Sequence, residues 1–69
     1  KDFKKAKMHV QKAVRLMPSD PIVNDHFGDI LWMNKKKIQA RYYWNYVLTL
    51  KDTKNNMREN IEKKLVYGP

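Results

Sequence analysis

Three side chains with acid–base or metal-binding chemistry stand close together in the sequence: Asp25, His26 and Asp29. If this stretch is helical, Asp25 and Asp29 share one face, whereas His26 points about 100° away from Asp25. A zinc site needs three or four converging ligands, and the other histidine, His9, belongs to a different segment. We therefore predict that the chain holds no metal ion.

Nucleophilic and phosphate-transfer chemistry is equally poorly supported. The sequence contains no cysteine and no glycine-rich phosphate loop. Ser19 falls in a turn before a helix, without the histidine and carboxylate partners of a catalytic triad. Paired carboxylates on an open helical surface also lack a pocket that excludes water. We predict a non-enzymatic protein with no catalytic residue and no cofactor.

The segment 41–46, Arg-Tyr-Tyr-Trp-Asn-Tyr, mixes a cation with aromatic rings that could stack on nucleic-acid bases. Tyr43 and Trp44 stand at core spacing in a helix, which leaves Tyr42 and Tyr46 together on one flank beside Arg41. Aromatic residues at helical spacing more often form a core than a stacking platform. The segment is therefore interpreted mainly as packing.

Charge keeps nucleic acid as the alternative function. The 69-residue chain carries 15 basic and 7 acidic residues, a net charge of +8, which favours acidic partners. A small basic helical module would bind phosphates, and that binding would weaken steeply with salt. A codon bias towards A and T would produce the same lysine-rich composition without any such role. The lysines of this basic surface are Lys4, Lys5, Lys12, Lys35, Lys36 and Lys37.

Length and hydrophobic pattern bound the architecture. A chain of 69 residues forms one domain at most, and no apolar run approaches the ~20 residues of a membrane span. A first helix is expected over about 2–17, ended by Pro18, because proline disfavours helical geometry in the residue before it. Its apolar face comprises Phe3, Ala6, Val10, Ala13, Val14 and Met17.

The second helix has clear boundary signals. Asp20 is the expected N-cap, and Pro21 suits the first helical position because it has no N–H to leave unsatisfied. The helix is expected to end near Met33, with Asn34 in the left-handed conformation that terminates helices. The lysine run 35–37 then forms the turn.

Two further helices complete the prediction. The third, about 37–50, is apolar almost all round, which predicts contact on two sides. The fourth, about 54–66, is expected to be capped by Asp52 or Thr53 and stopped by the terminal Gly-Pro pair. It carries one narrow apolar stripe: Met57, Ile61 and Leu65.

The hydrophobic pattern repeats along the chain. Residues of the first helix return 34 positions later in the third, and 34 is the tetratricopeptide spacing. Gly28, inside an apolar helix, costs about 1 kcal/mol relative to alanine, so we expect it to permit a close helix crossing opposite Ala40. The repeated positions are Ala6, Val10, Ala13, Val14 and Leu16, followed by Ala40, Trp44, Val47, Leu48 and Leu50.

On these residues the chain resembles the tetratricopeptide repeat (TPR) family, and the stretch 25–32 is similar to the last repeats of large bacterial TPR proteins. The resemblance implies an all-α fold of antiparallel helix-turn-helix repeats, an α-solenoid fragment. It divides the single domain 1–69 into the second helix of a preceding repeat (1–18), one full repeat (21–52) and a capping helix (54–67). The signature residues are Phe27, Gly28, Leu31, Ala40, Trp44, Val47, Ala6 and Pro18.

The resemblance also implies function: a scaffold that binds a protein or peptide partner. Partner segments of the family usually lie in the groove lined by the first helix of each repeat. Asp25 and Asp29 would offer carboxylates there to a partner's lysine or arginine, unless they are only solvated acids favoured by the helix dipole. The expected groove residues are Ile22, Asp25, Asp29, Trp32 and Met33.

The first helix would lack the helix that pairs with it in an intact repeat, since the sequence opens at Lys1 within it. Repeats contact only their neighbours, so an uncovered apolar edge invites self-association. We therefore expect a homodimer through this helix. The edge consists of Met8, Val14 and Leu16.

Overall fold

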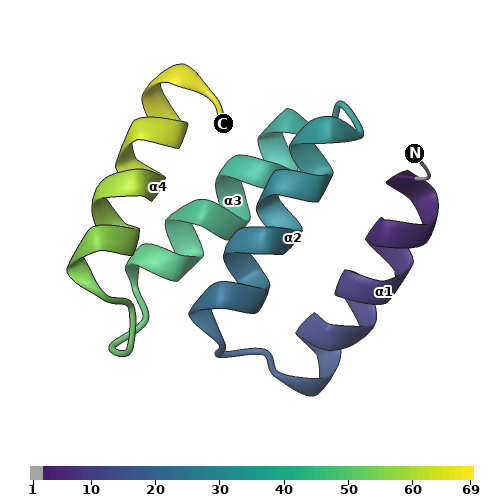
Figure 1. The fold of residues 1–69 in the computed structure, drawn as a ribbon, viewed down its shortest axis with the longest axis horizontal. Helices are drawn as coiled ribbons and strands as arrows, with labels where there is room; N and C mark the ends of the chain where they lie inside the picture. The colour runs from purple at the N-terminus through teal and green to yellow at the C-terminus, as the bar shows by residue number, and fades with distance from the viewer. Residues whose placement is uncertain (1–2) are drawn as a thin grey trace.

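The computed structural model describes residues 3–69, and all four elements within that range are α-helices (Figure 1). The predicted helix start at Asp2 and the side chain of Phe3 lie outside this description. The all-α fold predicted from the sequence is confirmed. The helices are α1 (Phe3–Leu16), α2 (Pro21–Met33), α3 (Lys37–Leu48) and α4 (Asn55–Tyr67).

The helices lie side by side in chain order, each antiparallel to the one before it (Figure 1). Packing follows the same order, because α1 packs on α2, α2 on α3 and α3 on α4. The α2–α3 pair is the most extensive contact, and the α3–α4 pair is the least extensive of the three. The result is a slab of 31 × 28 × 18 Å.

The N-terminus of α2 forms as predicted. The carboxylate of Asp20 accepts a hydrogen bond of 3.0 Å from the backbone N–H of Val23, and Pro21 is the first helical residue. Asn24, which is 1% exposed, reinforces the same end by donating its amide to the carbonyls of Pro18 and Asp20. The α1–α2 turn is therefore fixed by side-chain hydrogen bonds from within α2.

The end of α2 corrects the prediction for Asn34. Asn34 has φ −90°, and the left-handed residue is Lys35, with φ 63°. The amide of Asn34 donates to the carbonyl of Ile30 at 3.0 Å, which holds this residue near the helix. The backbone N–H of Lys36 then reaches the carbonyl of Leu31 at 2.8 Å. The helix therefore ends at Met33 as predicted, but the left-handed residue follows one position later than expected.

The start of α4 corrects a second prediction, because neither Asp52 nor Thr53 caps it. The helix begins at Asn55, and the residue before it provides no side-chain cap. The hydroxyl of Thr53 is buried and donates to the carbonyl of Val47 at 2.7 Å. Thr53 thus provides a hydrogen-bond donor to a carbonyl in the last turn of α3, where carbonyl groups lack partners within the helix.

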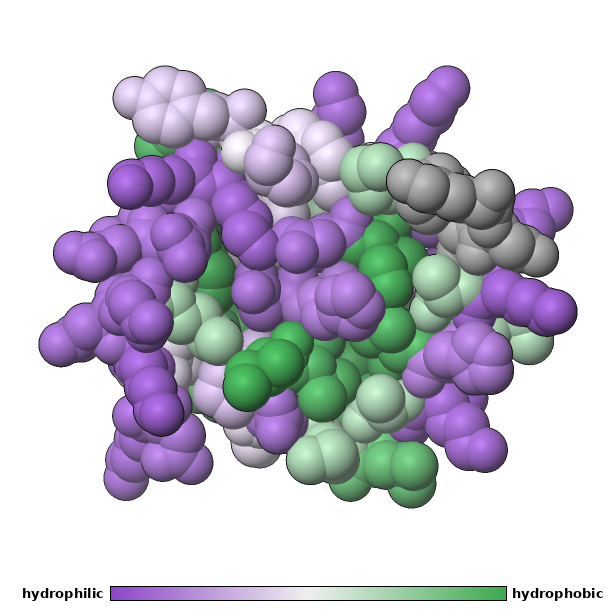
Figure 2. Space-filling view, in the orientation of Figure 1, coloured by the Kyte–Doolittle hydropathy of each residue, from purple (hydrophilic) through white to green (hydrophobic). Residues whose placement is uncertain are grey.

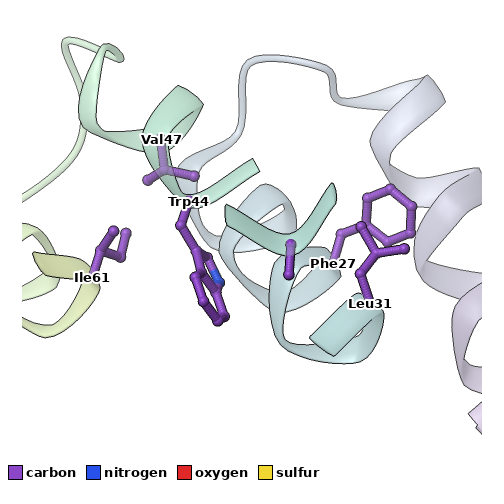
Figure 3. Close-up of a cluster of buried hydrophobic side chains, with 6 residues drawn as sticks. Phe27, Leu31, Trp44, Val47 and Ile61 are labelled. Carbon is purple, nitrogen blue, oxygen red and sulfur yellow. The ribbon is translucent and has the colours of Figure 1, made fainter. Parts of the chain in front are cut away.

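The core extends across α2 and α3, from Ile61 of α4 at one end to Phe27 and Leu31, which point toward α1, at the other (Figure 3). Trp44 at its centre is fully buried. A Cβ on Gly28 would lie 2.5 Å from Cδ1 of Trp44, so this glycine makes room for the indole ring. The close approach therefore involves the Trp44 side chain more directly than Ala40. The core residues are Phe27, Leu31, Ala40, Trp44, Val47 and Ile61.

The remaining signature residues occupy the α1 side. Ala6 is half-buried in α1. Pro18 follows the helix, and its carbonyl accepts hydrogen bonds from Asn24 and from the hydroxyl of Tyr46. The predicted stripe of α4 is confirmed, since Ile61 is fully buried while Met57 and Leu65 pack against the core.

Candidate partner-binding site

The two carboxylates that mark the predicted groove are joined by a lysine of this same chain. Nζ of Lys64, on α4, lies 2.7 Å from Oδ1 of Asp25 and 2.8 Å from Oδ1 of Asp29. The i, i+4 spacing on α2 places both carboxylates on one face, as the sequence predicted. Lys64 also lies 5.5 Å from the centre of the Trp44 ring. The position expected for a partner's cation is thus occupied by Lys64.

The ion pair is partly sheltered from solvent, since the side chains of Lys64, Asp25 and Asp29 are 17%, 21% and 37% exposed. The burial of Lys64 opposes the charged form and lowers the pKa. Hydrogen bonds and attraction from Asp25 and Asp29 act in the other direction and prevail, so the pKa of Lys64 is raised above 10.5. Lys64 is therefore a stable cation that fastens α4 to α2.

The other predicted groove residues do not converge on these carboxylates. Trp32 stacks on Trp44 with ring centres 5.5 Å apart, and Nζ of Lys37 lies 5.1 Å above the Trp32 ring. Ile22 and Met33, at opposite ends of α2, are 68% and 55% exposed. Trp32 is therefore partly a packing residue, and the five predicted residues form no single site.

A depression of about 460 Å³ does open between α2 and α4, but of the predicted residues only Asp25 lines it. Its walls come mainly from α4 and the C-terminal segment. The side chains there are one carboxylate, amides, cations, one thioether and one aromatic ring, and the polar ones suit hydrogen bonds to a peptide. The α4 contribution is Asn56, Met57, Asn60, Lys63, Lys64 and Tyr67.

The predicted self-association edge is partly present on α1. Met8 is 68% exposed and Leu16 is 73% exposed. Val14 corrects the prediction, because it is half-buried and packs against the core. A shallow depression of about 510 Å³ surrounds Met8 with basic and polar side chains. In Figure 2, apolar surface gathers around α1 and α2, whereas the α4 side is largely hydrophilic.

The aromatic and basic stretch 41–46 is divided among different contacts. Arg41 donates to the carbonyl of Leu65 on α4 at 2.9 Å. The hydroxyl of Tyr46 donates to the carbonyl of Pro18 at 3.1 Å, at the α1–α2 turn. Tyr42 remains 65% exposed. Arg41 thus contacts α4, whereas Tyr46 contacts the α1–α2 turn. The two side chains therefore build no common stacking surface with Tyr42.

The sequence reasoning missed Lys64 and Arg58. The guanidinium of Arg58 donates to the carbonyls of Leu48 (2.7 Å), Leu50 (2.9 Å) and Thr53 (3.2 Å), and so closes the C-terminal end of α3. A basic residue near the start of a helix gave no signal for this role. Lys64 is 39 positions from Asp25, and only the packing of α4 brings the two together.

Comparison with known proteins assigns no relationship: no family model matches the chain, and no curated protein and no solved structure matches it significantly. Within residues 3–69, the helices are too short or too polar to cross a lipid bilayer. Class and function therefore have to be argued from the packing and the surfaces.

Proposed function

We propose that this chain is a non-catalytic protein–protein interaction module of the tetratricopeptide type. The observation that carries the proposal is the order of packing, in which helices pack chiefly against their neighbours in sequence. Such an arrangement is typical of helical-repeat arrays, which use extended surfaces to bind partners. The 34-residue correspondence between α1 and α3 supports the same assignment.

The exposed surfaces favour a protein partner. Met8 and Leu16 place large apolar side chains in solvent on α1, and exposed apolar patches often mark interaction sites. The partner would be a helix or peptide of another protein, or a second copy of the chain docked on α1. The residues 3–16 contain no acidic side chain, so like charges oppose the second copy at low salt.

Nucleic acid is the weaker alternative. Its support is the net charge of +8 and the exposed lysines of α1 and the α2–α3 turn. Against it, Arg41 and Tyr46 are engaged with backbone carbonyls. Electrostatic binding by lysines alone would be weak and unspecific at physiological salt.

Sedimentation equilibrium at ~150 mM and ~500 mM salt, with and without a short DNA duplex, tests the proposal. Self-association that persists at high salt, and is lost in a Met8→Ser/Leu16→Ser variant, would support docking on α1. The control is Val66→Ser, which changes an equally exposed residue, 73%, on α4. A monomer that takes up duplex at low salt and releases it at high salt would favour the nucleic-acid module instead. A monomer without duplex binding would leave only a heterologous protein partner.

A further inference from the structure

A second surface lies between α1 and α3, and neither Asp25 nor Asp29 of the predicted groove lines it. A depression of about 500 Å³, which we call the α1–α3 groove, runs between these helices over α2. Phe27 and Leu31 of the core form its floor, and amide side chains stand at its walls. Its lining residues include Lys7, Gln11, Phe27, Leu31, Gln39 and Tyr42.

The α3 wall of this groove exposes large apolar side chains. Ile38 is 86% exposed and Tyr42 is 65% exposed, although the nearby α3 residues Ala40 and Trp44 are fully buried. The two residues are one helical turn apart and therefore share a face. Covering an isoleucine removes apolar surface from water and so favours association, which lets this wall supply an apolar anchor point.

The groove continues into a cluster of cations. Lys35, Lys36 and Lys37, which we call the lysine turn, line an adjoining depression of about 370 Å³. Ile38 and Gln39 line both depressions, so the apolar wall and the lysine turn are contiguous. None of the described residues that line either depression is acidic. A ligand spanning both would need apolar groups at one end and negative charge at the other.

The backbone of the lysine turn provides an independent observation. Lys35 adopts φ 63°, a left-handed conformation that carries an energetic cost for a residue with a side chain. Glycine would adopt the same conformation without that cost. A lysine side chain therefore stands at a position where the backbone geometry alone would favour glycine. This fits a use for the Lys35 charge outside the fold.

We propose that the α1–α3 groove and the lysine turn together bind an acidic peptide segment of a partner protein. Apolar side chains of the peptide lie over the Phe27–Leu31 floor against Ile38 and Tyr42, and its Asp or Glu residues contact the lysine turn. Gln11 and Gln39 can hydrogen-bond to the peptide backbone. The inference rests on the proposed protein-binding function but places the partner on a surface different from the Met8 and Leu16 edge.

Selection from a random dodecapeptide display library against the folded chain at ~150 mM salt provides the probe. Enriched peptides are expected to combine two or more apolar residues with a run of Asp or Glu, in either order. An absence of enriched peptides would overturn the inference. Enrichment of peptides without acidic residues would overturn it as well.

Fluorescence anisotropy with the most enriched peptide then locates the site. Ile38→Asp is expected to weaken binding at least tenfold, because it removes an apolar anchor and places a carboxylate beside the lysine turn, where it repels an acidic peptide. The matched control is Val66→Asp on α4, where the replaced side chain is also strongly exposed, 73%. Equal affinity of both variants for the peptide would overturn the inference.

Lys35→Gly separates binding from folding. The variant is expected to bind the peptide about two- to fivefold more weakly, the range for one exposed ion pair. Its melting temperature should be no lower than that of the wild type, because glycine relieves the left-handed backbone. Weaker binding together with a lower melting temperature would count against a role of the charge.

A twelve-base-pair DNA duplex distinguishes a phosphate site from a peptide site. Duplex binding that depends on Lys35 and is indifferent to Ile38→Asp would overturn the peptide assignment. If peptide binding is instead lost in Met8→Ser/Leu16→Ser and retained in Ile38→Asp, this inference fails while the proposed interaction function stands. The two proposals thus fail in different experiments.

Discussion

Helices α1 and α3 carry matching residues 34 positions apart but are buried to very different depths. Ala40, Trp44 and Val47 of α3 are all fully buried, 0% exposed, whereas their α1 counterparts are only half-buried. The reason is the number of neighbours, because α3 lies between α2 and α4 while α1 packs chiefly on α2 (Figure 1). The matched pairs are Ala6 with Ala40, Val10 with Trp44, and Ala13 with Val47.

Two helices with the same hydrophobic pattern can therefore contribute very differently to the stability of the fold. The same face of the helix becomes a core in α3 and a half-covered surface in α1. Stability should therefore depend mainly on α3, and α1 is the helix with surface to offer a partner. Within residues 3–69, α1 packs chiefly on one helix and α3 on two, which accounts for the difference in burial.

The largest expected effect is that of removing the Trp44 side chain. Trp44→Ala should destabilise the fold by about 3–5 kcal/mol, because it leaves a large cavity. A core of this size supplies only about 3–5 kcal/mol in total, so the variant should be largely unfolded at 25 °C. Urea denaturation followed by circular dichroism measures the loss.

The matched α1 variant, Val10→Ala, should cost only about 1 kcal/mol, since the side chain is half-buried and α1 can settle on α2. Similar losses for the two variants would contradict the difference between α1 and α3. In that case α1 would be as integral to the core as α3.

Gly28→Ala should destabilise by about 1–3 kcal/mol through overpacking against Trp44. Alanine improves helix propensity by about 1 kcal/mol, which offsets part of that loss. A smaller ring, introduced as Trp44→Phe in the same chain, should recover stability relative to the sum of the two single changes. Strict additivity in this double-mutant cycle would show that Gly28 is not needed to make room for the indole ring of Trp44.

Local signals in the sequence were sufficient for most of the fold. Asp20 and Pro21 act within one turn of the helix they start, and the stripe Met57, Ile61 and Leu65 follows from helical spacing alone. Such features depend on neighbours in sequence, and their positions were predicted to within two residues.

The failures share a different cause, because they depend on contacts that only folding creates. Thr53 is a residue type that often caps helices, but its hydroxyl donates a hydrogen bond to the carbonyl of Val47 in α3. Lys64 contacts Asp25 from 39 positions away in the sequence. The sequence alone therefore did not indicate that a lysine of the same chain occupies the predicted carboxylate site. Lys35 takes a left-handed conformation that the asparagine before it would adopt more easily.

Weakening the contact of α4 with α2 and α3 should leave α3 less covered, as α1 is, and should lower the stability of the fold. Lys64→Met keeps the aliphatic length but leaves Asp25 and Asp29 without their cation, and should cost about 1 kcal/mol. Lys63→Met, a change of the neighbouring exposed lysine, is the control. Equal stability of the two variants would show that the ion pair contributes nothing measurable.

The same contact predicts a pH dependence. The pKa of Lys64 in the folded chain is raised above 10.5, so its stabilising contribution is complete below the unfolded pKa of about 10.4. That contribution is lost as pH rises through the folded value. The stability difference between wild type and Lys64→Met should thus be constant from pH 7 to 10 and shrink at higher pH. A difference that grows above pH 10.5 would contradict the linkage.

The smallest effect on stability is expected at Leu16, whose counterpart 34 positions later is Leu50, just beyond the end of α3. Leu16 is 73% exposed, so Leu16→Ser should change the free energy of unfolding by less than about 0.5 kcal/mol. Leu50 is half-buried, and Leu50→Ser should cost about 1–2 kcal/mol. Both unfolding curves should be measured at low micromolar protein concentration, where docking between copies contributes little to stability. If Leu16→Ser is as costly as Leu50→Ser even there, then α1 is covered within the monomer and the proposed interaction edge does not exist. If it is neutral when dilute and destabilising only when concentrated, the side chain stabilises the chain through a partner.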